Sequence, residues 1–282
     1  MSLYTSVLKQ VLVATDLSGP SDRAVERALQ LAAARGAELD IVHVMEEGLP
    51  AEAQAEITAA NETAIREKLA ASPFADQVKV TIDLVVGNAE TDIVERAVMA
   101  NADCIVLGLH DRLLAENLPI EGTLAETVIG SSTLPVLLVR NEPRAAYQTV
   151  VVGIDFSPLS HAALEAAMLI APAATLHLVH AYEGDSDQAQ MAEQRLKSFV
   201  AGESRVFERA AHQAGLPEIS VRTMAEQGDP REALKIQIDR RGADLLVMGT
   251  RGRTGLTRTL LGSVTTDLIN ARLCDVLVIR PK

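Results

Sequence analysis

The residues with the clearest chemical potential lie in one short segment near the end of the chain, 249–263, with the sequence GTRGRTGLTRTLLGS. It follows a short apolar run and precedes a helical pattern. Glycine lets main-chain N–H groups approach a phosphate without a Cβ in the way, and a helix N-terminus attracts anions. Arginines can add charge-assisted hydrogen bonds. The segment therefore predicts a polyphosphate cradle, and a glycine-punctuated surface loop is the alternative. Its glycines and arginines are Gly249, Gly252, Gly255, Gly262, Arg251, Arg253 and Arg258.

This segment matches neither of the two common phosphate-binding motifs. The chain contains no G-x-x-x-x-G-K-[ST] sequence, which excludes a Walker P-loop. The dinucleotide-binding turn follows the first strand of a βαβ unit, whereas this segment follows the fourth predicted strand of its half.

The composition restricts the partners and the compartment. The formal net charge is −12 and aromatic residues make up 2% of the chain, which argues against binding to nucleic acid or to an acidic membrane surface. The longest apolar run, 166–174, is too short to span a bilayer, and the first residues do not resemble a secretion signal. We expect a cytoplasmic protein whose two cysteines, Cys104 and Cys274, are reduced.

The chain repeats itself at a distance of about 140 residues. VLVATDLS at 11–18 corresponds to VVVGIDFS at 150–157, and STLPVLLVR at 132–140 corresponds to RLCDVLVIR at 272–280. A repeat of this length is two copies of a domain and not a solenoid. We predict domains at 1–141 and 149–282, joined by a polar linker.

Each half alternates apolar strand-like runs with helical patterns. In the second half the strands are expected at 149–155, 175–181, 219–225, 244–249 and 275–280. Leu196, Phe199 and Phe207 recur at helical spacing, which predicts one helix that ends at Gly215. Regular strand–helix alternation predicts an α/β fold in which each domain has a five-stranded, parallel, doubly wound sheet. Such sheets bind ligands at the carboxyl ends of their strands, where segment 249–263 lies.

The glycine segment and its neighbours resemble the universal stress protein family, specifically its tandem two-domain members. The family's signature is G, two residues, G, nine residues and G-[ST], and the C-terminal half matches it from Gly249 to Ser263 without a gap. The resemblance implies a fold of the adenine nucleotide alpha hydrolase-like type. It also implies a stress-response function and binding of ATP or a related adenine nucleotide.

The resemblance also implies the roles of individual residues. Asp155 would lie beside the adenosine, with Mg²⁺ held through water as a further option, and a simple turn residue is the alternative. The backbone of Ala181 would meet the adenine edge. The expected nucleotide-binding residues are Gly153, Ile154, Asp155, Ala181, Gly249, Thr250, Arg251, Gly252, Arg253, Thr254, Gly255, Gly262, Ser263 and Val264.

The corresponding N-terminal segment, 108–123, departs from the signature. Asp111 replaces the second glycine, and one extra residue separates it from Gly122. Between the outer glycines this segment has one arginine and three acids, a charge of −2, against three arginines and no acid, +3, in the C-terminal half. Because a carboxylate repels phosphate, we predict that the N-terminal domain binds ATP poorly or not at all.

Three functions from different classes compete. The leading hypothesis is a nucleotide-binding sensor or signalling module, and the others are a nucleotide-free protein-interaction module and an adenylylating enzyme of the ATP pyrophosphatase type. No nucleophile–base pair is apparent, so at most slow ATP hydrolysis is expected. A metal shared by His177 and His180 is disfavoured because residues three apart on a strand face opposite sides. A homodimer and an internal pseudo-dimer of the two halves both remain open.

Overall fold

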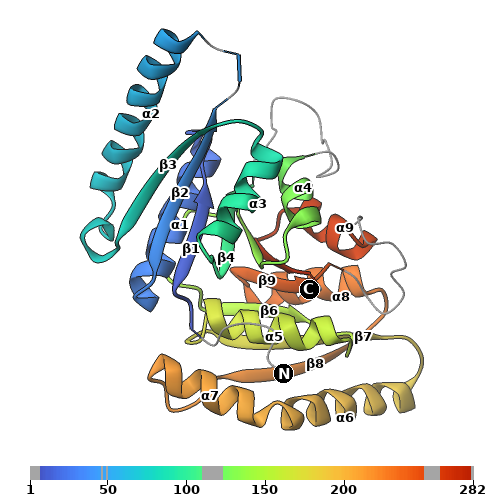
Figure 1. Cartoon of the computed structure of the whole chain (residues 1–282). Helices are drawn as coiled ribbons and strands as arrows, with labels where there is room; N and C mark the ends of the chain where they lie inside the picture. Colours follow the sequence, from blue (N-terminus) through green and yellow to red (C-terminus); the bar gives the residue numbers. More distant parts are fainter. Residues whose placement is uncertain (1–6, 46, 49, 110–122, 251–260, 281–282) are drawn as a thin grey trace. The chain divides into compact units, whose positions relative to one another are not determined.

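A computed structural model describes residues 7–45, 47–48, 50–109, 123–250 and 261–280 of the chain (Figure 1). The chain divides into an N-terminal unit, Leu8–Arg144, and a C-terminal unit that begins at Ala145. Both units are α/β domains with parallel sheets, as predicted.

The N-terminal unit alternates strands with helices and one short 3₁₀ turn. Its sheet has the strand order β3-β2-β1-β4-β5, and every pair of neighbours is parallel. Its elements are β1 (Gln10–Ala14), α1 (Gly19–Arg35), β2 (Glu38–Met45), α2 (Ala51–Ala71), η1 (Ala75–Gln77), β3 (Val80–Val86), α3 (Ala89–Met99), β4 (Cys104–Gly108), α4 (Leu124–Ser131) and β5 (Val136–Val139).

The C-terminal unit repeats this topology with the strand order β8-β7-β6-β9-β10, again parallel throughout. Its elements are β6 (Thr149–Gly153), α5 (Pro158–Ile170), β7 (Thr175–Tyr182), α6 (Ser186–Gly202), α7 (Ser204–Ala214), β8 (Val221–Gln227), α8 (Pro230–Arg241), β9 (Leu245–Gly249), α9 (Ser263–Ala271) and β10 (Asp275–Ile279). No described helix is both long and apolar enough to cross a membrane.

The burial of the strands follows their place in each sheet. The central strands β1 and β6 are almost entirely buried along runs of Val and Leu, because helices cover both faces. The edge strands β3 and β8 are half-buried along most of their length and carry polar side chains. The apolar core of each unit therefore lies along the middle of its sheet.

The predicted ligand edge coincides with the point where the strand order reverses. Strand β6 pairs with β7 on one side and β9 on the other, with Gly153 opposite Val179 and Val152 opposite Val247. The chain leaves β6 and β9 at the same edge in opposite directions, which opens a crevice in doubly wound sheets. Segments 153–155 and 249–250 are thereby brought side by side.

One predicted helix is in fact two. The helical spacing that continues to Phe207 is interrupted at Glu203, which separates α6 from α7 (Figure 1). Gly215 ends α7 in a left-handed conformation with φ 66°, as its position in the sequence indicated. The interruption places the Glu203 side chain against α5, as described below.

Candidate functional site

A pocket of about 170 Å³ lies at the carboxyl edge of the C-terminal sheet. Its floor is apolar, and its polar residues come from the turn after β6, from α5 and β7, and from the start of α9. The lining residues are Gly153, Ile154, Asp155, Ser157, Leu159, Ser160, Val179, His180, Ala181, Pro230, Leu234, Met248, Gly249, Val264 and Thr265. An apolar cleft with a few convergent polar groups is typical of a small-molecule site.

Asp155 is the carboxylate of this pocket, and the residues that follow β6 fix its orientation. Its Oδ1 accepts hydrogen bonds from the Ser157 amide at 2.9 Å and from the Ser160 hydroxyl at 2.5 Å. Its Oδ2 is shielded from water and has no hydrogen-bond partner among the described residues. Among the described residues, one oxygen of this firmly held carboxylate thus remains open to a further donor.

The electrostatic state of Asp155 results from two opposing effects. Burial raises the pKa of the carboxyl group, whereas hydrogen bonds from Ser157 and Ser160 lower it. The hydrogen bonds prevail, so the pKa lies below its ordinary value and the group is ionised at neutral pH.

The start of α9 forms the opposite wall of the pocket. Gly262 is the N-cap residue, and no side chain caps this helix within the described part of the chain. The Gly262 amide donates to the Thr250 carbonyl at 2.8 Å, and the Thr265 hydroxyl donates to the Gly249 carbonyl at 3.0 Å. The first turn contains no acid. These bonds hold an uncapped helix N-terminus beside the end of β9, an arrangement that attracts anions.

An aromatic cluster supports the turn that contains Asp155. Phe156 has a positive φ of 62°, and its ring centroid lies 4.4 Å from that of His180 and 5.9 Å from that of Phe199. The guanidinium of Arg195 lies 4.2 Å from the centroid of the Phe156 ring, a cation–π contact. His180 is fixed in turn, because its Nδ1 lies 2.8 Å from the Ile154 carbonyl and donates to it.

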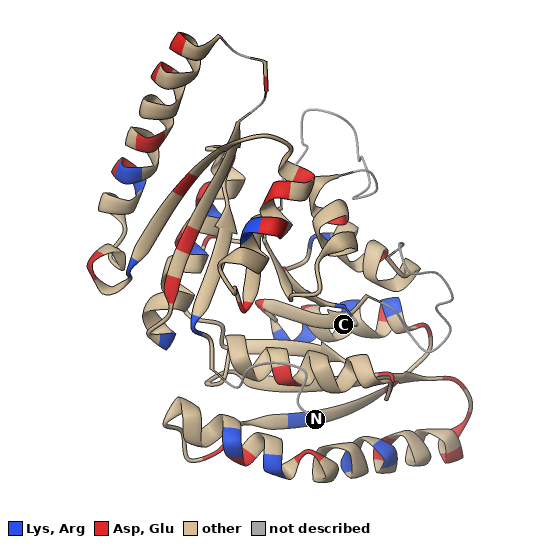
Figure 2. Ribbon diagram, in the orientation of Figure 1, with Lys and Arg blue, Asp and Glu red and all other residues tan. Residues whose placement is uncertain are grey.

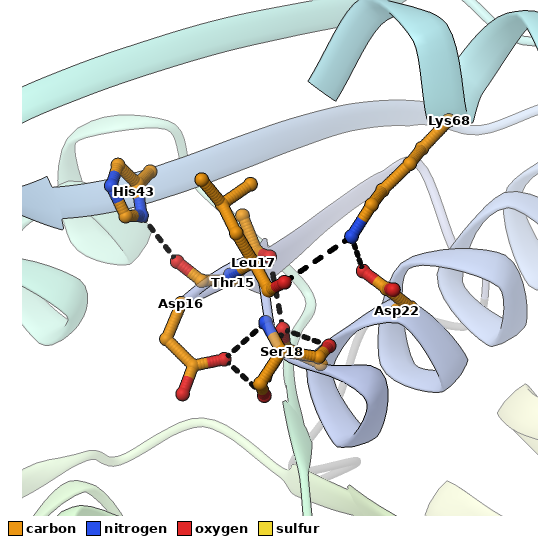
Figure 3. Close-up of polar contacts among 8 residues, drawn as sticks. Thr15, Asp16, Leu17, Ser18, Asp22, His43 and Lys68 are labelled. Atoms are coloured by element: carbon orange, nitrogen blue, oxygen red, sulfur yellow. Dashed lines mark hydrogen bonds and ion pairs between the residues drawn. The ribbon is translucent and has the colours of Figure 1, made fainter. Parts of the chain in front are cut away.

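The N-terminal unit repeats this turn with different contacts (Figure 3). Asp16 is exposed, and its Oδ1 accepts from the Ser18 amide at 3.1 Å and the Ser18 hydroxyl at 2.5 Å. Ser21, the counterpart of Ser160, is instead 3.1 Å from the Thr15 hydroxyl and does not hold the carboxylate. His43 Nδ1 donates to the Thr15 carbonyl at 2.8 Å. His43 and His180, at equivalent positions of the repeat, therefore share a structural role.

The helix that would face a phosphate also differs in the N-terminal unit. Thr123 caps α4, because its hydroxyl accepts from the Glu126 amide at 3.3 Å. Glu126 adds a negative charge to the first turn, where α9 has none. In the N-terminal unit, the Thr123 hydroxyl thus takes up an amide that could otherwise donate to a phosphate. The Glu126 carboxylate would repel an anion at the same helix end.

In both units a side-chain pair joins the first helix to the helical region that follows the second strand. The acidic partner lies on the first helix in the N-terminal unit and on the later helical region in the C-terminal unit. Asp22 of α1 pairs with Lys68 of α2, whose Nζ also donates to the Leu17 carbonyl at 3.3 Å (Figure 3). At the position equivalent to Asp22, His161 of α5 pairs through Nδ1 with the Glu203 carboxylate at 2.6 Å. His161 therefore contacts its own chain and does not line the pocket.

The predicted site residues that the structure describes lie at or beside one edge. Gly153, Ile154, Asp155, Ala181, Gly249 and Val264 line the pocket. Thr250 is buried beside it, and Gly262 and Ser263 begin α9. The predicted residues Arg251, Gly252, Arg253, Thr254 and Gly255 lie outside the described residues. His177 and His180 occupy opposite faces of β7, and the described part of the chain contains no metal-binding group of three His, Cys, Asp or Glu side chains.

Sequence reasoning missed part of the pocket. Leu234 and Pro230 come from α8, and Met248 comes from β9. Ser160 could have been found, because the spacing from Asp155 to Ser160 repeats that from Asp16 to Ser21. The apolar floor gave no comparable signal, since its members are ordinary core residues until the strands are paired.

Comparisons with known proteins agree on the family. The model of the universal stress protein family matches twice, over residues 8–140 and 146–280, which confirms the tandem arrangement. A universal stress protein of Mycobacterium tuberculosis (strain ATCC 25618 / H37Rv) is 35% identical over 144 residues, 48% of this chain and 97% of that protein. One of Mycolicibacterium smegmatis is 29% identical over 175 residues, 57% of this chain and 59% of that protein's length.

The fold is shared with a solved structure along almost the whole chain. The crystal structure of a universal stress protein from Archaeoglobus fulgidus has a TM-score of 0.73 and 20% identity, and the match covers 98% of each chain. The two consecutive family matches span most of the 282 residues. The chain belongs to the universal stress protein family.

Proposed function

We propose that this protein binds one adenine nucleotide, ATP or a related compound, in the pocket of its C-terminal unit, and acts as a cytoplasmic sensor or signalling module in a stress response. The observation that chiefly supports the proposal is that, in the described part of the chain, an Asp155 oxygen without a partner and a helix N-terminus without a side-chain cap lie across one apolar pocket. A nucleotide needs a hydrogen-bond acceptor for its ribose hydroxyls, an apolar surface for its base and hydrogen-bond donors for its phosphates.

Asp155 would hold the ribose. Carboxylates commonly accept hydrogen bonds from ribose hydroxyls, and this one is ionised, oriented by Ser160 and free at Oδ2 among the described residues. Ala181 and Val179 of β7, with Leu234 and Met248, would pack against the base.

The phosphates would lie against the N-terminus of α9. The amides of Ser263 and Val264 begin this helix, and the segment Gly249–Gly255 that precedes it carries the arginines of the signature. Arginine and helix amides both favour a polyphosphate. Mg²⁺ brought by the phosphates also fits the site, held by Asp155 through water. Oδ2 has no partner among the described residues, and one carboxylate oxygen can accept from a ribose hydroxyl and from a metal-bound water together. The metal would neutralise phosphate charge.

Only the C-terminal unit would bind the nucleotide. In the N-terminal unit Asp16 is exposed, Thr123 caps the helix and Glu126 lies in its first turn. Each difference removes a nucleotide contact or adds repulsion, in addition to the charge reversal in the signature segment.

Mass spectrometry of the nucleotides released on denaturation, followed by calorimetric titration of the emptied chain with Mg-ATP, tests the proposal. We expect close to one adenine nucleotide per chain. The substitution Gly252→Asp, which imitates Asp111, should abolish binding while the circular dichroism spectrum is unchanged. Two equivalent sites per chain would contradict the one-site proposal. A chain that never binds Mg-ATP would favour the protein-interaction alternative, and pyrophosphate release with an acceptor would favour the adenylylating enzyme.

A further inference from the structure

A second cluster of polar side chains lies at the other end of the C-terminal sheet, away from the pocket. It consists of His177 near the start of β7, Arg222 near the start of β8 and Arg241 at the end of α8. Parallel pairing puts His177 directly opposite Arg222. We call these three residues the basic cluster.

Contacts with α8 bring Arg241 to the same face of the sheet. Its Nη2 lies 3.4 Å from the sulfur of Met224, which is two residues beyond Arg222 and so shares its face of β8. Its Nε donates to the Gln237 side-chain oxygen at 3.2 Å. Among the described residues, both partners of the Arg241 guanidinium are uncharged, so neither offsets its positive charge.

The basic cluster contains no acid of its own. The side chain of Arg222 is exposed and makes no hydrogen bond or ion pair with any described residue. Glu226 is the carboxylate on the same face of β8, and it accepts from Gln237 and lies 3.9 Å from Arg240. Neither Arg222 nor Arg241 pairs with Glu226 or with another described carboxylate, so their positive charges repel each other, and a bound anion would relieve that repulsion.

His177 provides the second, independent observation. The residue is 8% exposed, and its Nδ1 is buried without a hydrogen-bond partner among the described residues. Buried polar atoms in native proteins are normally paired, so an isolated ring nitrogen suggests a missing partner or ligand. Burial and the positive charges of Arg241 and Arg222 lower the pKa of His177.

The corresponding positions of the N-terminal unit lack this basic character. Repeat alignment places Asp40, Thr81 and Ala100 where the C-terminal unit has His177, Arg222 and Arg241, and Asp40 pairs opposite Thr81 as His177 pairs opposite Arg222. In Figure 2, β2 and β3 carry acidic segments and no basic one, whereas β8 and α8 carry segments of both signs, including basic ones at the start of β8 and at the end of α8. The cluster is therefore specific to one copy of the domain.

We propose that His177, Arg222 and Arg241 form a second anion site, which binds a phosphate group as inorganic phosphate or as a phosphate monoester. The planar fork of each guanidinium matches two phosphate oxygens. The anion would offset the field of the arginines, so that His177 becomes protonated at a higher pH in the bound state. This site neither requires nor overlaps the nucleotide pocket, and its test is independent of ATP binding.

The experiment is an NMR titration of the ring resonances of His177 with sodium phosphate in the full chain, at an ionic strength kept constant with sodium chloride. We expect a saturable shift and a rise in the midpoint of His177 protonation. Arg222→Thr and Arg241→Ala, which introduce the residues of the N-terminal unit at exposed positions, should each weaken phosphate binding about tenfold or more. Circular dichroism verifies that both variants fold.

Arg240→Gln is the matched control, because it removes the same charge from the neighbouring residue of α8, which faces Glu226. Phosphate affinity should be unchanged in this variant. A shift that never saturates, or an equal loss in Arg240→Gln, would overturn the proposal, since diffuse surface charge would then explain the response. Methyl phosphate distinguishes the two sources of the ligand: equal affinity indicates a phosphate monoester site, and selective binding of inorganic phosphate indicates a site for the free anion.

Discussion

Replacing Asp155 by asparagine should separate the ligand role of this residue from its structural role. Asparagine keeps the size of the side chain and an oxygen that can accept from Ser157 and Ser160, but it lacks the charge and the second acceptor oxygen. A hydrogen bond to a charged group contributes about 1.5–3 kcal/mol. Loss of one such bond to a ribose hydroxyl predicts a Kd for Mg-ATP that rises between about 10-fold and about 150-fold.

Isothermal titration calorimetry measures this change directly. Asp16→Asn is the control, because Asp16 is the equivalent residue of the N-terminal unit and its side chain is exposed. We expect wild-type affinity in that variant. A Kd for Asp155→Asn within twofold of wild type, in a folded protein, would show that the carboxylate does not contact the ligand.

We also expect the difference in stability between wild type and Asp155→Asn to depend on pH. The pKa of Asp155 is lowered in the folded state despite its burial, because of the hydrogen bonds from Ser157 and Ser160. Its contribution to the free energy of unfolding is therefore present above the unfolded-state pKa of about 4 and is lost as the pH falls through the folded pKa. Urea denaturation of wild type and Asp155→Asn between pH 6 and pH 2 should give stabilities that converge below about pH 4. Divergence on acidification would contradict the assignment.

Three further predictions concern the C-terminal pocket, its core and a buried thiol. Gly153→Ala introduces the alanine that the N-terminal unit has at the equivalent position, Ala14, and should weaken ATP binding without lowering Tm. The added Cβ would lie on the pocket floor, 3.5 Å from its nearest neighbour, which is an ordinary contact. A lower Tm would show overpacking instead. Tyr147→Phe removes a buried 2.7 Å hydrogen bond to Asp275 and should cost about 2 kcal/mol in urea denaturation, and an unchanged midpoint would show that the bond is dispensable. Burial, with the adjacent Asp103 charge, raises the pKa of the Cys104 thiol to about 12, so a thiol reagent at pH 8 should label it only after unfolding, and rapid labelling of the native chain would refute this.

The architecture of each unit could be predicted because its signals are local and repeated. Buried strands such as β6 are continuous apolar runs, and the duplication supplies each pattern twice. The α6–α7 interruption could not be predicted in this way. Helical spacing continues past Glu203, and the break coincides with a tertiary contact between Glu203 and His161, 42 residues earlier.

The site was predictable where its residues lie close in sequence and not where strand pairing assembles it. Asp155 and the glycine segment are recognisable because a motif or a repeat marks them. Leu234 and Met248 meet only because α8 packs on β6 and β7 and β9 pairs beside β6, and nothing in their own neighbourhoods distinguishes them from other core residues. The basic cluster depends likewise on the register that sets His177 opposite Arg222.

The opposite polarity of the two side-chain pairs that join the helices has a consequence for folding. Tandem copies of one domain can exchange equivalent helices while the chain folds. If α2 packed against α5, Lys68 would face His161, and if the α6–α7 junction packed against α1, Glu203 would face Asp22. The second mispairing sets two carboxylates against each other, and the first sets a lysine against a histidine. The carboxylates of Asp22 and Glu203 thus disfavour one of the two exchanges, and this helps two similar domains in one chain to fold without swapping parts.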